Sequence, residues 1–271
     1  MSRSTQVLVF DSGVGGLSII SEIRALLPHI SITYASDNAY FPYGEKHEAD
    51  LIERVEGVLQ RLVARFKPEV IVIACNTAST VALPRIRNHF KQAIIGVVPA
   101  IKPAAQLSQS KTIAVLATPG TIQRPYTQQL ISDFAADCKV LTLGSSTLVQ
   151  IAESKLRGET VDPKDLSAVV VPLLAHPDYP LVDTIVLACT HFPFLKQELT
   201  NLLGEGLRWV DSGNAIARRL QNVLVEHDLH PGTESNEREY QSVFTANNPL
   251  IHKLVPALES HFPSEIHFDV M

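Results

Sequence analysis

Two short apolar runs that end in a cysteine stand out in the hydrophobic pattern of the chain. The first covers residues 70–74 and continues as Cys-Asn-Thr, and the second covers residues 185–188 and continues as Cys-Thr-His. A continuous apolar run of this length, followed abruptly by polar residues, predicts a fully buried strand of a parallel sheet. Each strand would therefore carry a cysteine, Cys75 or Cys189, to its carboxyl end.

Strand and helix patterns alternate along the rest of the chain, which predicts an α/β protein with parallel sheets flanked by helices. The other predicted strands comprise residues 6–10, 30–35, 93–98, 112–116, 139–143 and 207–210. The predicted helices comprise residues 17–27, 48–66, 80–90, 121–136, 149–155, 163–174, 194–203 and 214–225. Irregular segments are expected at residues 37–46, 117–120 and 226–239, where Pro, Gly or polar residues gather.

The order of these elements occurs twice, which predicts two pseudo-symmetric domains. A strand, turn and helix beginning at Val7 recur at Ile113, and one of the cysteine strands follows each copy. We expect one α/β domain from residues 1–98 and 210–271, with residues 99–209 inserted as the second. Because ligands bind at the carboxyl ends of parallel strands, both cysteines would face one active-site cleft between the domains.

The composition of the chain is that of an ordinary folded protein. Its 271 residues are 45% hydrophobic and 19% charged, and the net charge of −5 argues against a nucleic-acid-binding protein. We find no apolar run as long as a transmembrane helix and no export signal, so a cytoplasmic protein that binds neither membrane nor nucleic acid is expected. An N-terminal extension that could hold an activator is not expected. The three cysteines are expected to be free thiols.

Two thiols that face one cleft can invert a carbon stereocentre. A thiolate removes the acidic proton from one face of the carbon, and a thiol on the other face supplies a new proton. Because a free cysteine has a pKa of about 8.5, each thiol needs activation, for which the dipole of the following helix, Asp11 and His191 are available. Hydroxyls, an amide and backbone N–H groups at the strand ends would hold a small anion such as an amino acid or a dicarboxylate.

Five short motifs sharpen this hypothesis. They read DSGVGGL at residues 11–17, YFPYGEK at 40–46, ACNTAS at 74–79, ACTHFP at 188–193 and VDSG at 210–213. Together, and in this order, they resemble the glutamate racemases of the aspartate/glutamate racemase family over roughly residues 5–225. The resemblance implies a cofactor-independent, homodimeric isomerase that interconverts L- and D-glutamate. It also implies a role in supplying D-glutamate for peptidoglycan, and thus in cell-wall biogenesis and cell shape.

The resemblance also implies roles for individual residues. Cys75 would remove the proton of D-glutamate with help from Asp11, and Cys189 that of L-glutamate with help from His191. Glu153 matches a family glutamate with an auxiliary role, although Lys155 stands where a glycine is common. The substrate is expected to contact Asp11, Ser12, Tyr43, Gly44, Asn76, Thr77, Thr190 and His191, and the strand-end position of Thr118 adds that residue.

Other interpretations stay open at this point. The two strand-end cysteines, Asp11 and His191 are suitable zinc ligands, although the chain has no Cys-x-x-Cys pair, and we expect no metal. The glycine-rich residues 13–18, with Asp37 further on, partly match a dinucleotide-binding fingerprint, but we expect no cofactor. The chain could also be a racemase of aspartate or another amino acid, or a non-catalytic binding module for small anions. Cys138 has no polar motif around it and is expected to be structural.

Overall fold

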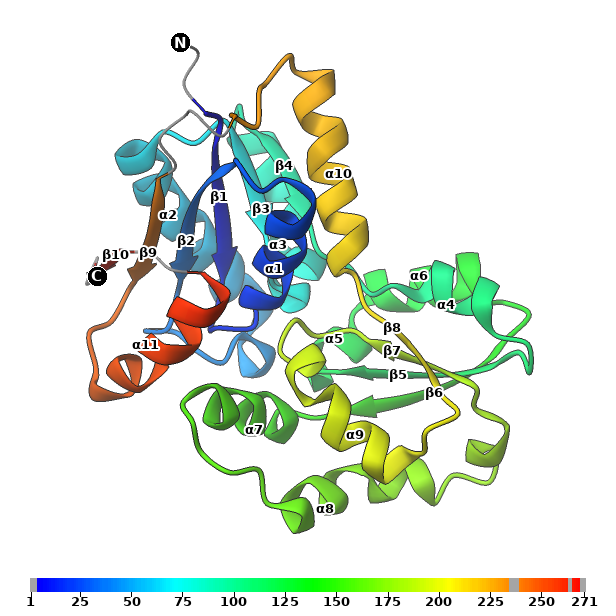
Figure 1. The fold of residues 1–271 in the computed structure, drawn as a ribbon. Coiled ribbons are helices and arrows are strands. Elements are labelled where there is room, and N and C mark those ends of the chain that lie inside the picture. Colours follow the sequence, from blue (N-terminus) through cyan, green and yellow to red (C-terminus); the bar gives the residue numbers. More distant parts are fainter. Residues whose placement is uncertain (1–3, 234–238, 263–264, 269–271) are drawn as a thin grey trace.

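Ten strands form two parallel sheets in the computed structural model, which describes residues 4–233, 239–262 and 265–268 (Figure 1). The larger sheet has the order β10-β9-β2-β1-β3-β4 and the smaller one the order β6-β5-β7-β8. The larger sheet comprises β1 (Gln6–Asp11), β2 (Ser31–Ser36), β3 (Val70–Ile73), β4 (Ala93–Gly96), β9 (Tyr240–Phe244) and β10 (Glu265–Phe268). The smaller one comprises β5 (Thr112–Ala117), β6 (Lys139–Gly144), β7 (Thr184–Leu187) and β8 (Arg208–Val210). The predicted α/β class is thus confirmed.

The two sheets share one topology. The order β2-β1-β3-β4 of the larger sheet is repeated as β6-β5-β7-β8 in the smaller one, and β9 and β10 extend the larger sheet beyond β2. Every neighbouring pair in both sheets is parallel. The strands that precede the two cysteines, β3 and β7, therefore occupy equivalent positions, each directly beside the first strand of its repeat.

Helices cover both faces of the larger sheet because alternate strand residues point to opposite sides. Val7 and Val9 of β1 pack beneath one helical layer, whereas Leu8 and Phe10 pack beneath the other. The first layer comprises α1 (Leu17–Leu26), α10 (Gly213–Glu226) and α11 (Pro249–His261), and the second α2 (Glu48–Phe66) and α3 (Asn76–His89). Helices from the two ends of the chain thus share the hydrophobic core on one face of this sheet.

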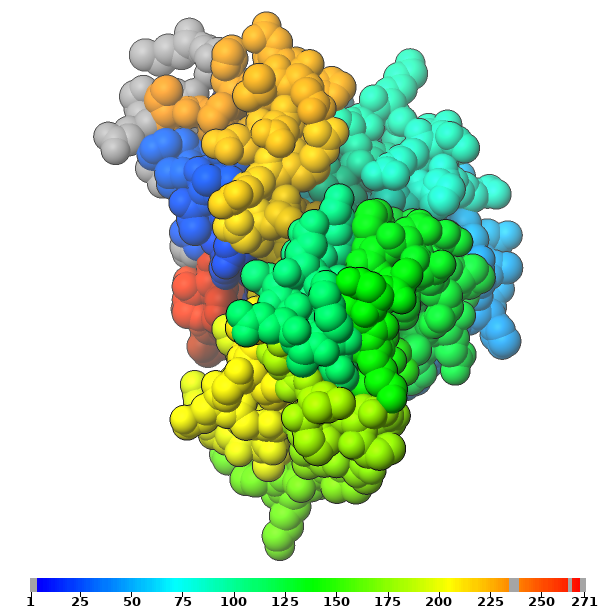
Figure 2. Space-filling view, turned by 90° about the vertical axis from the view of Figure 1, so that its right-hand side faces the viewer, coloured from blue at the N-terminus to red at the C-terminus, as the bar shows by residue number. Residues whose placement is uncertain are grey.

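The smaller sheet is covered in the same way. One face packs against α7 (Thr147–Leu156), α8 (Pro163–Leu174) and α9 (Lys196–Leu203), and the other against α4 (Ile101–Leu107), α5 (Pro119–Gln123) and α6 (Pro125–Phe134). Short 3₁₀ turns lie at η1 (Tyr43–Glu45), η2 (Tyr179–Leu181) and η3 (Phe192–Leu195). Figure 2 shows the smaller sheet's part of the molecule, in green and yellow-green, below segments nearer the chain ends, in blue and orange. Nowhere in the described part of the chain is a helix both long and apolar enough to span a membrane.

The helix predicted over residues 121–136 is wrong in extent. It is two helices, α5 and α6, which meet at Arg124. Pro125 disfavours a helical conformation at the residue before it and has no backbone N–H to continue the helix. The turn predicted at residues 117–120 is partly helical as well, since α5 begins at Pro119.

Other elements also differ from the predicted ones. The helix α3 begins at Asn76 instead of Thr80, because the Cys75 sulfur accepts a hydrogen bond from the third N–H of the helix and so acts as its N-cap. The pattern does not predict α4 at all. A 3₁₀ turn occupies the start of the helix predicted from Phe194. The loop predicted over residues 226–239 lies partly outside the described residues, and so does the end of the chain after Phe268.

Candidate active site

One cavity brings both strand-end cysteines together. Its lining comes from both sheets and consists of Ser12, Phe41, Pro42, Tyr43, Gly44, Cys75, Asn76, Thr77, Thr118, Ser146, Val149, Cys189, Thr190 and His191. Both thiols are free and buried. The space between these residues is about 20 Å³, roughly the room that one water molecule needs.

The predicted site residues fall into two groups around this cavity. Ser12, Thr77, Thr118 and Thr190 line it with the other predicted contacts, whereas Asp11 and Glu153 lie behind the lining. Sequence reasoning did not assign Phe41, Pro42, Ser146 and Val149. The first two belong to the motif at residues 40–46, which was the available signal, and no sequence signal pointed to the other two.

Cys75 sits between β3 and α3, with its sulfur turned toward polar groups of the larger sheet. The Sγ accepts a hydrogen bond from Ala78 N–H at 3.5 Å and lies 3.8 Å from Ser12 Oγ. Burial raises the pKa of the Cys75 thiol, the charge of Asp11 raises it further, and the Ala78 N–H lowers it. The net direction is upward, so the predicted activation by the helix end is outweighed. The thiolate would need an added positive charge nearby.

Asp11 ends β1 and holds the glycine-rich turn that leads into α1. Its Oδ1 accepts a hydrogen bond from Ser12 N–H at 2.7 Å, and its Oδ2 accepts one from Gly16 N–H at 2.6 Å. Burial raises the pKa of this carboxyl, while the charge of His191 and these backbone N–H groups lower it. Asp11 thus organises the turn as a helix cap would, and it also places a carboxyl beside the Cys75 thiol.

Cys189 follows β7 and is paired with a buried histidine. His191 Nδ1 lies 3.8 Å from Cys189 Sγ, and its Nε2 lies 2.8 Å from Glu153 Oε1. The same Glu153 oxygen accepts a hydrogen bond from Val14 N–H at 2.9 Å. Burial lowers the pKa of His191, but the hydrogen bonds to Cys189 and Glu153 raise it, and the result is well above the usual value. An imidazolium at this position would favour the Cys189 thiolate.

The glycine-rich turn packs directly against the smaller sheet's side of the cavity. A Cβ on Gly15 would lie 2.7 Å from Thr190 Oγ1, and one on Gly13 would lie 2.9 Å from the Phe41 ring. Ser18 Oγ donates a hydrogen bond to Thr190 O at 2.8 Å, which ties α1 to the opposite strand end. The glycines thus let the backbone of the turn approach the opposite strand end closely.

Asn76 is the polar residue of the lining that has the most to offer a ligand. The residue is 3% exposed, and within the described part of the protein neither atom of its side-chain amide has a hydrogen-bond partner. Buried amides are almost always hydrogen-bonded, so this one is poised to bind a molecule in the cavity. Thr77 Oγ1 and Thr118 Oγ1, from opposite sheets, lie 3.2 Å apart beside it.

Tyr43 lines the cavity, but its hydroxyl is not free to hold the substrate as predicted. Its hydroxyl donates a hydrogen bond to Asp37 Oδ2 at 2.6 Å, so the phenol is already engaged. Burial raises the pKa of Tyr43, and the charge of Asp37 raises it further. Its ring and backbone, together with Gly44, therefore form the wall of the cavity, and Asp37 is not free to bind a ribose.

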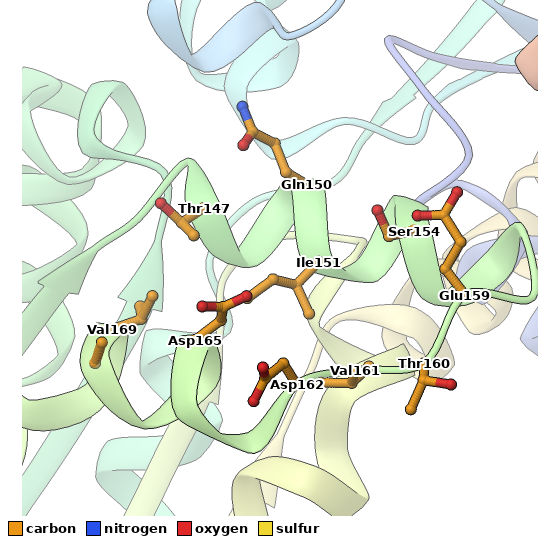
Figure 3. Close-up of a pocket in the computed structure, with 11 residues that line it drawn as sticks. Thr147, Gln150, Ile151, Ser154, Glu159, Thr160, Val161, Asp162, Asp165 and Val169 are labelled. Atoms are coloured by element: carbon orange, nitrogen blue, oxygen red, sulfur yellow. The ribbon is translucent and has the colours of Figure 1, made fainter.

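A second cavity lies away from the cysteines, between α7 and α8. It has a volume of about 600 Å³, and Figure 3 shows Gln150 and Ser154 of α7 above Asp162 and Asp165 at the start of α8. Neither cysteine nor histidine is among its lining residues, so it lacks the acid–base groups of the first cavity. Across the described ranges, no three His, Cys, Asp or Glu side chains are grouped to hold a metal ion.

Cys138 lies apart from both cavities. It is partly exposed, packs at the edge of the core beneath α6, and its Sγ donates a hydrogen bond to Asp137 Oδ1 at 3.6 Å. Asp211, which repeats the Asp-Ser-Gly tripeptide, accepts a hydrogen bond from Gly213 N–H at 2.8 Å at the start of α10. Neither residue lines the cavity that Cys75 and Cys189 share.

Comparison with known proteins agrees with the motifs. A family model described as Asp/Glu/Hydantoin racemase matches residues 17–220. A glutamate racemase from Pectobacterium carotovorum is 48% identical over 260 residues, which cover 96% of this chain and 89% of the relative. One from Salmonella typhimurium is 48% identical over 255 residues, covering 94% and 88%.

Solved structures of similar proteins share the fold. Escherichia coli glutamate racemase, in complex with L-glutamate and the activator UDP-MurNAc-ala, matches with a TM-score of 0.90 at 44% identity, covering 98% of both chains. A Bacillus anthracis glutamate racemase isoform matches with a TM-score of 0.81 at 26% identity, covering 100% of this chain and 98% of the other. The resemblance seen in the five motifs is confirmed. With its repeated α/β topology, this chain belongs to the Asp/Glu/hydantoin racemase family of isomerases.

Proposed function

We propose that this protein interconverts L- and D-glutamate, with Cys75 and Cys189 as the two acid–base groups and without a cofactor. The observation that carries the proposal is the cavity itself: two free thiols, from equivalent strand ends of two repeated sheets, line the same small space. Inversion at carbon needs proton transfer on opposite faces of one atom, and a pseudo-symmetric pair of strands supplies groups from opposite sides.

The proton transfers balance without any further reagent. In one direction the Cys75 thiolate takes the α-proton of D-glutamate, and the Cys189 thiol gives its proton to the opposite face, which yields L-glutamate. Cys75 is then a thiol and Cys189 a thiolate, which is the state needed for the reverse reaction. The high pKa of Cys75 requires that the substrate activate it, and the α-ammonium of an amino acid brings the required positive charge.

Different neighbours assist the two thiols. Asp11 lies behind Ser12 and does not line the cavity, so it would assist transfer at Cys75 through space, its negative charge favouring the substrate ammonium beside the thiol. His191 would stabilise the Cys189 thiolate, and Glu153 would act through His191, because it touches the imidazole and does not line the cavity. Ser12, Tyr43, Gly44, Asn76, Thr77, Thr118, Thr190 and His191 would hold the substrate, with the unpartnered amide of Asn76 among the donors.

The size of the cavity implies a motion. A glutamate molecule has several times the volume of one water, so the larger and smaller sheets must separate for substrate to enter and close to exclude water. We assign the moving units as residues 1–98 with 210–271, and residues 99–209. The resemblance further supports a homodimer in the cytoplasm that supplies D-glutamate for peptidoglycan, and glutamate is the substrate named for the relatives with 48% identity.

Deuterium incorporation tests this proposal. The protein is incubated in deuterated water with glutamate, aspartate or alanine, and the α-carbon is followed by NMR and chiral chromatography. Deuterium should enter glutamate as the enantiomers equilibrate. Incorporation into aspartate but not glutamate would instead support the aspartate alternative, and none in any amino acid would support a binding module.

Serine substitution tests the two thiols separately. Cys75→Ser and Cys189→Ser should each reduce turnover by at least about a thousandfold, since a serine hydroxyl is a far weaker acid than a thiol. Folding and glutamate binding, measured by calorimetry, should persist. Cys138→Ser is the matched control and should retain parental activity. Parental turnover in either active-site variant would refute the two-thiol mechanism.

A further inference from the structure

Asp37 is a buried carboxylate that the proposed proton transfers do not use. It follows β2, is 0% exposed, and its two oxygens receive four hydrogen bonds. Oδ1 accepts from Arg54 Nη2 at 2.6 Å and from Thr245 Oγ1 at 2.7 Å. Oδ2 accepts from Arg54 Nε at 2.9 Å and from the Tyr43 hydroxyl at 2.6 Å. The carboxylate is therefore fixed in orientation by a two-pronged guanidinium and two hydroxyls.

These donors come from separate parts of the chain. Arg54 belongs to α2, Thr245 directly follows β9, and Tyr43 opens the 3₁₀ turn η1. The backbone N–H of Asp37 also donates to the carbonyl of Asp11 at 2.8 Å, at the end of the central strand β1. The carboxylate of Asp37 thus joins a helix, the C-terminal part of the larger sheet and the turn η1, and its backbone N–H adds the strand that carries Asp11.

Tyr43 connects this network to the cavity. It is 1% exposed, and it lines the cavity together with Phe41, Pro42 and Gly44. On the far side of this segment, a Cβ on Gly44 would lie only 2.9 Å from the Thr118 Cβ. Residues 41–44 are therefore held between the Asp37 network and the smaller sheet, with little space to shift on the cavity side.

We propose that Asp37 is a positioning residue that fixes residues 41–44 as a wall of the substrate cavity. This role deepens the proposed function and rests on it. Asp37 acts through the Tyr43 hydroxyl, whose place in the network sets where the ring and the following backbone lie. Because the wall contacts the substrate and not the transferred proton, loosening it weakens substrate binding more than the chemical step.

A buried ion pair can also serve stability alone, and the chain contains a matched control for that role. Glu56 lies on α2, as Arg54 does, and is 6% exposed. Its carboxylate pairs with Arg85 Nε at 2.5 Å and with His89 Nδ1 at 2.9 Å. It links α2 to α3, and neither it nor its partners belong to the cavity lining. Removing its charge tests the loss of a buried carboxylate that pairs with two more exposed cations, without disturbing the wall.

The experiment compares Asp37→Asn with Glu56→Gln in the full-length protein. Both variants should lose thermal stability, but only Asp37→Asn should raise the KM for both glutamate enantiomers. We expect a rise of up to about tenfold, the limit reached when the full energy of one charge-assisted hydrogen bond within the wall is lost from substrate binding, with kcat within about threefold. Arg54→Lys, which keeps the charge but not the two-pronged contact, should give a smaller rise. Equal KM values for the Asp37 and Glu56 variants would overturn the proposal.

Amide hydrogen exchange measures the wall without reference to turnover. The N–H groups of residues 40–46 should exchange faster in Asp37→Asn than in the parent protein, and at the parental rate in Glu56→Gln. If Asp37→Asn does not fold, Thr245→Val removes one of the four hydrogen bonds to the same carboxylate, together with the one that Thr245 Oγ1 accepts from Ala39 N–H at 3.1 Å, and should show the same pattern more weakly. Parental exchange in the folded Asp37 or Thr245 variants would overturn the positioning role. A parent protein that does not racemise glutamate would refute the proposed function, and the exchange comparison would still test Asp37.

Discussion

The substitution Glu153→Gln removes one negative charge that lies 2.8 Å from His191 Nε2 and preserves the shape of the side chain. Glutamine can still accept the hydrogen bond from Val14 N–H, so the glycine-rich turn should keep its place. What changes is the partner of the imidazole. A charged acceptor becomes a neutral one in a site where His191 is 2% exposed.

The size and sign of the effect follow from the groups around His191. Burial lowers the pKa of His191, whereas the hydrogen bonds to Cys189 and Glu153 raise it. Without the Glu153 charge, one of the interactions that raise the pKa of His191 is lost, so this pKa must fall. A charged hydrogen bond is worth about 1–2 kcal/mol more than a neutral one, and 1.36 kcal/mol corresponds to one pKa unit. We therefore expect a decrease of roughly one unit.

The decrease should appear in the pH dependence of turnover. If the His191 imidazolium supports the Cys189 thiolate, activity is lost as the pH rises through the pKa of His191. The alkaline limb of the kcat/KM profile should thus move to lower pH by roughly one unit in Glu153→Gln. Because the equilibrium constant between enantiomers is one, kcat/KM must change equally in both directions, and either direction serves as the assay.

A control variant separates this effect from a general disturbance of α7. Glu198→Gln removes a carboxylate of α9 that pairs at 2.6 Å with Nζ of Lys155, and Lys155 lies on α7, as Glu153 does. It does not contact the imidazole, so its pH profile should coincide with that of the parent. The reasoning would be refuted if Glu153→Gln retained the parental profile, or if Glu198→Gln moved it equally.

Two other substitutions should separate binding from packing. Asn76→Leu removes the unpartnered amide, so the KM should rise about tenfold while thermal stability holds or improves; lower stability with an unchanged KM would contradict this. Gly15→Ala forces a methyl group against Thr190 and should cost about 1–3 kcal/mol in unfolding free energy, together with most activity. Gly57→Ala, in open space on α2, should instead stabilise the protein slightly, and equal effects of the two alanines would exclude a steric cause.

Local patterns were sufficient for most of the secondary structure. The apolar spacing over residues 48–66 predicts α2 with the bounds that the structure has, because one amphipathic helix face is visible within a single window. Boundaries failed where a specific contact or a proline decided them. The thiol cap of Cys75 starts α3 early, and Pro125 divides α5 from α6.

The sequence by itself determined that two buried strands, repeated in order, would each end in a cysteine, because burial and strand period are properties of neighbouring residues. Only the tertiary structure decided which groups those cysteines meet. Glu153 and His191 are 38 residues apart in the chain and 2.8 Å apart in space. The upward shift in the Cys75 pKa likewise depends on burial and on the distance to the Asp11 charge. Electrostatic energies follow distance and solvent exposure in three dimensions, which a one-dimensional pattern of apolar and polar residues does not contain.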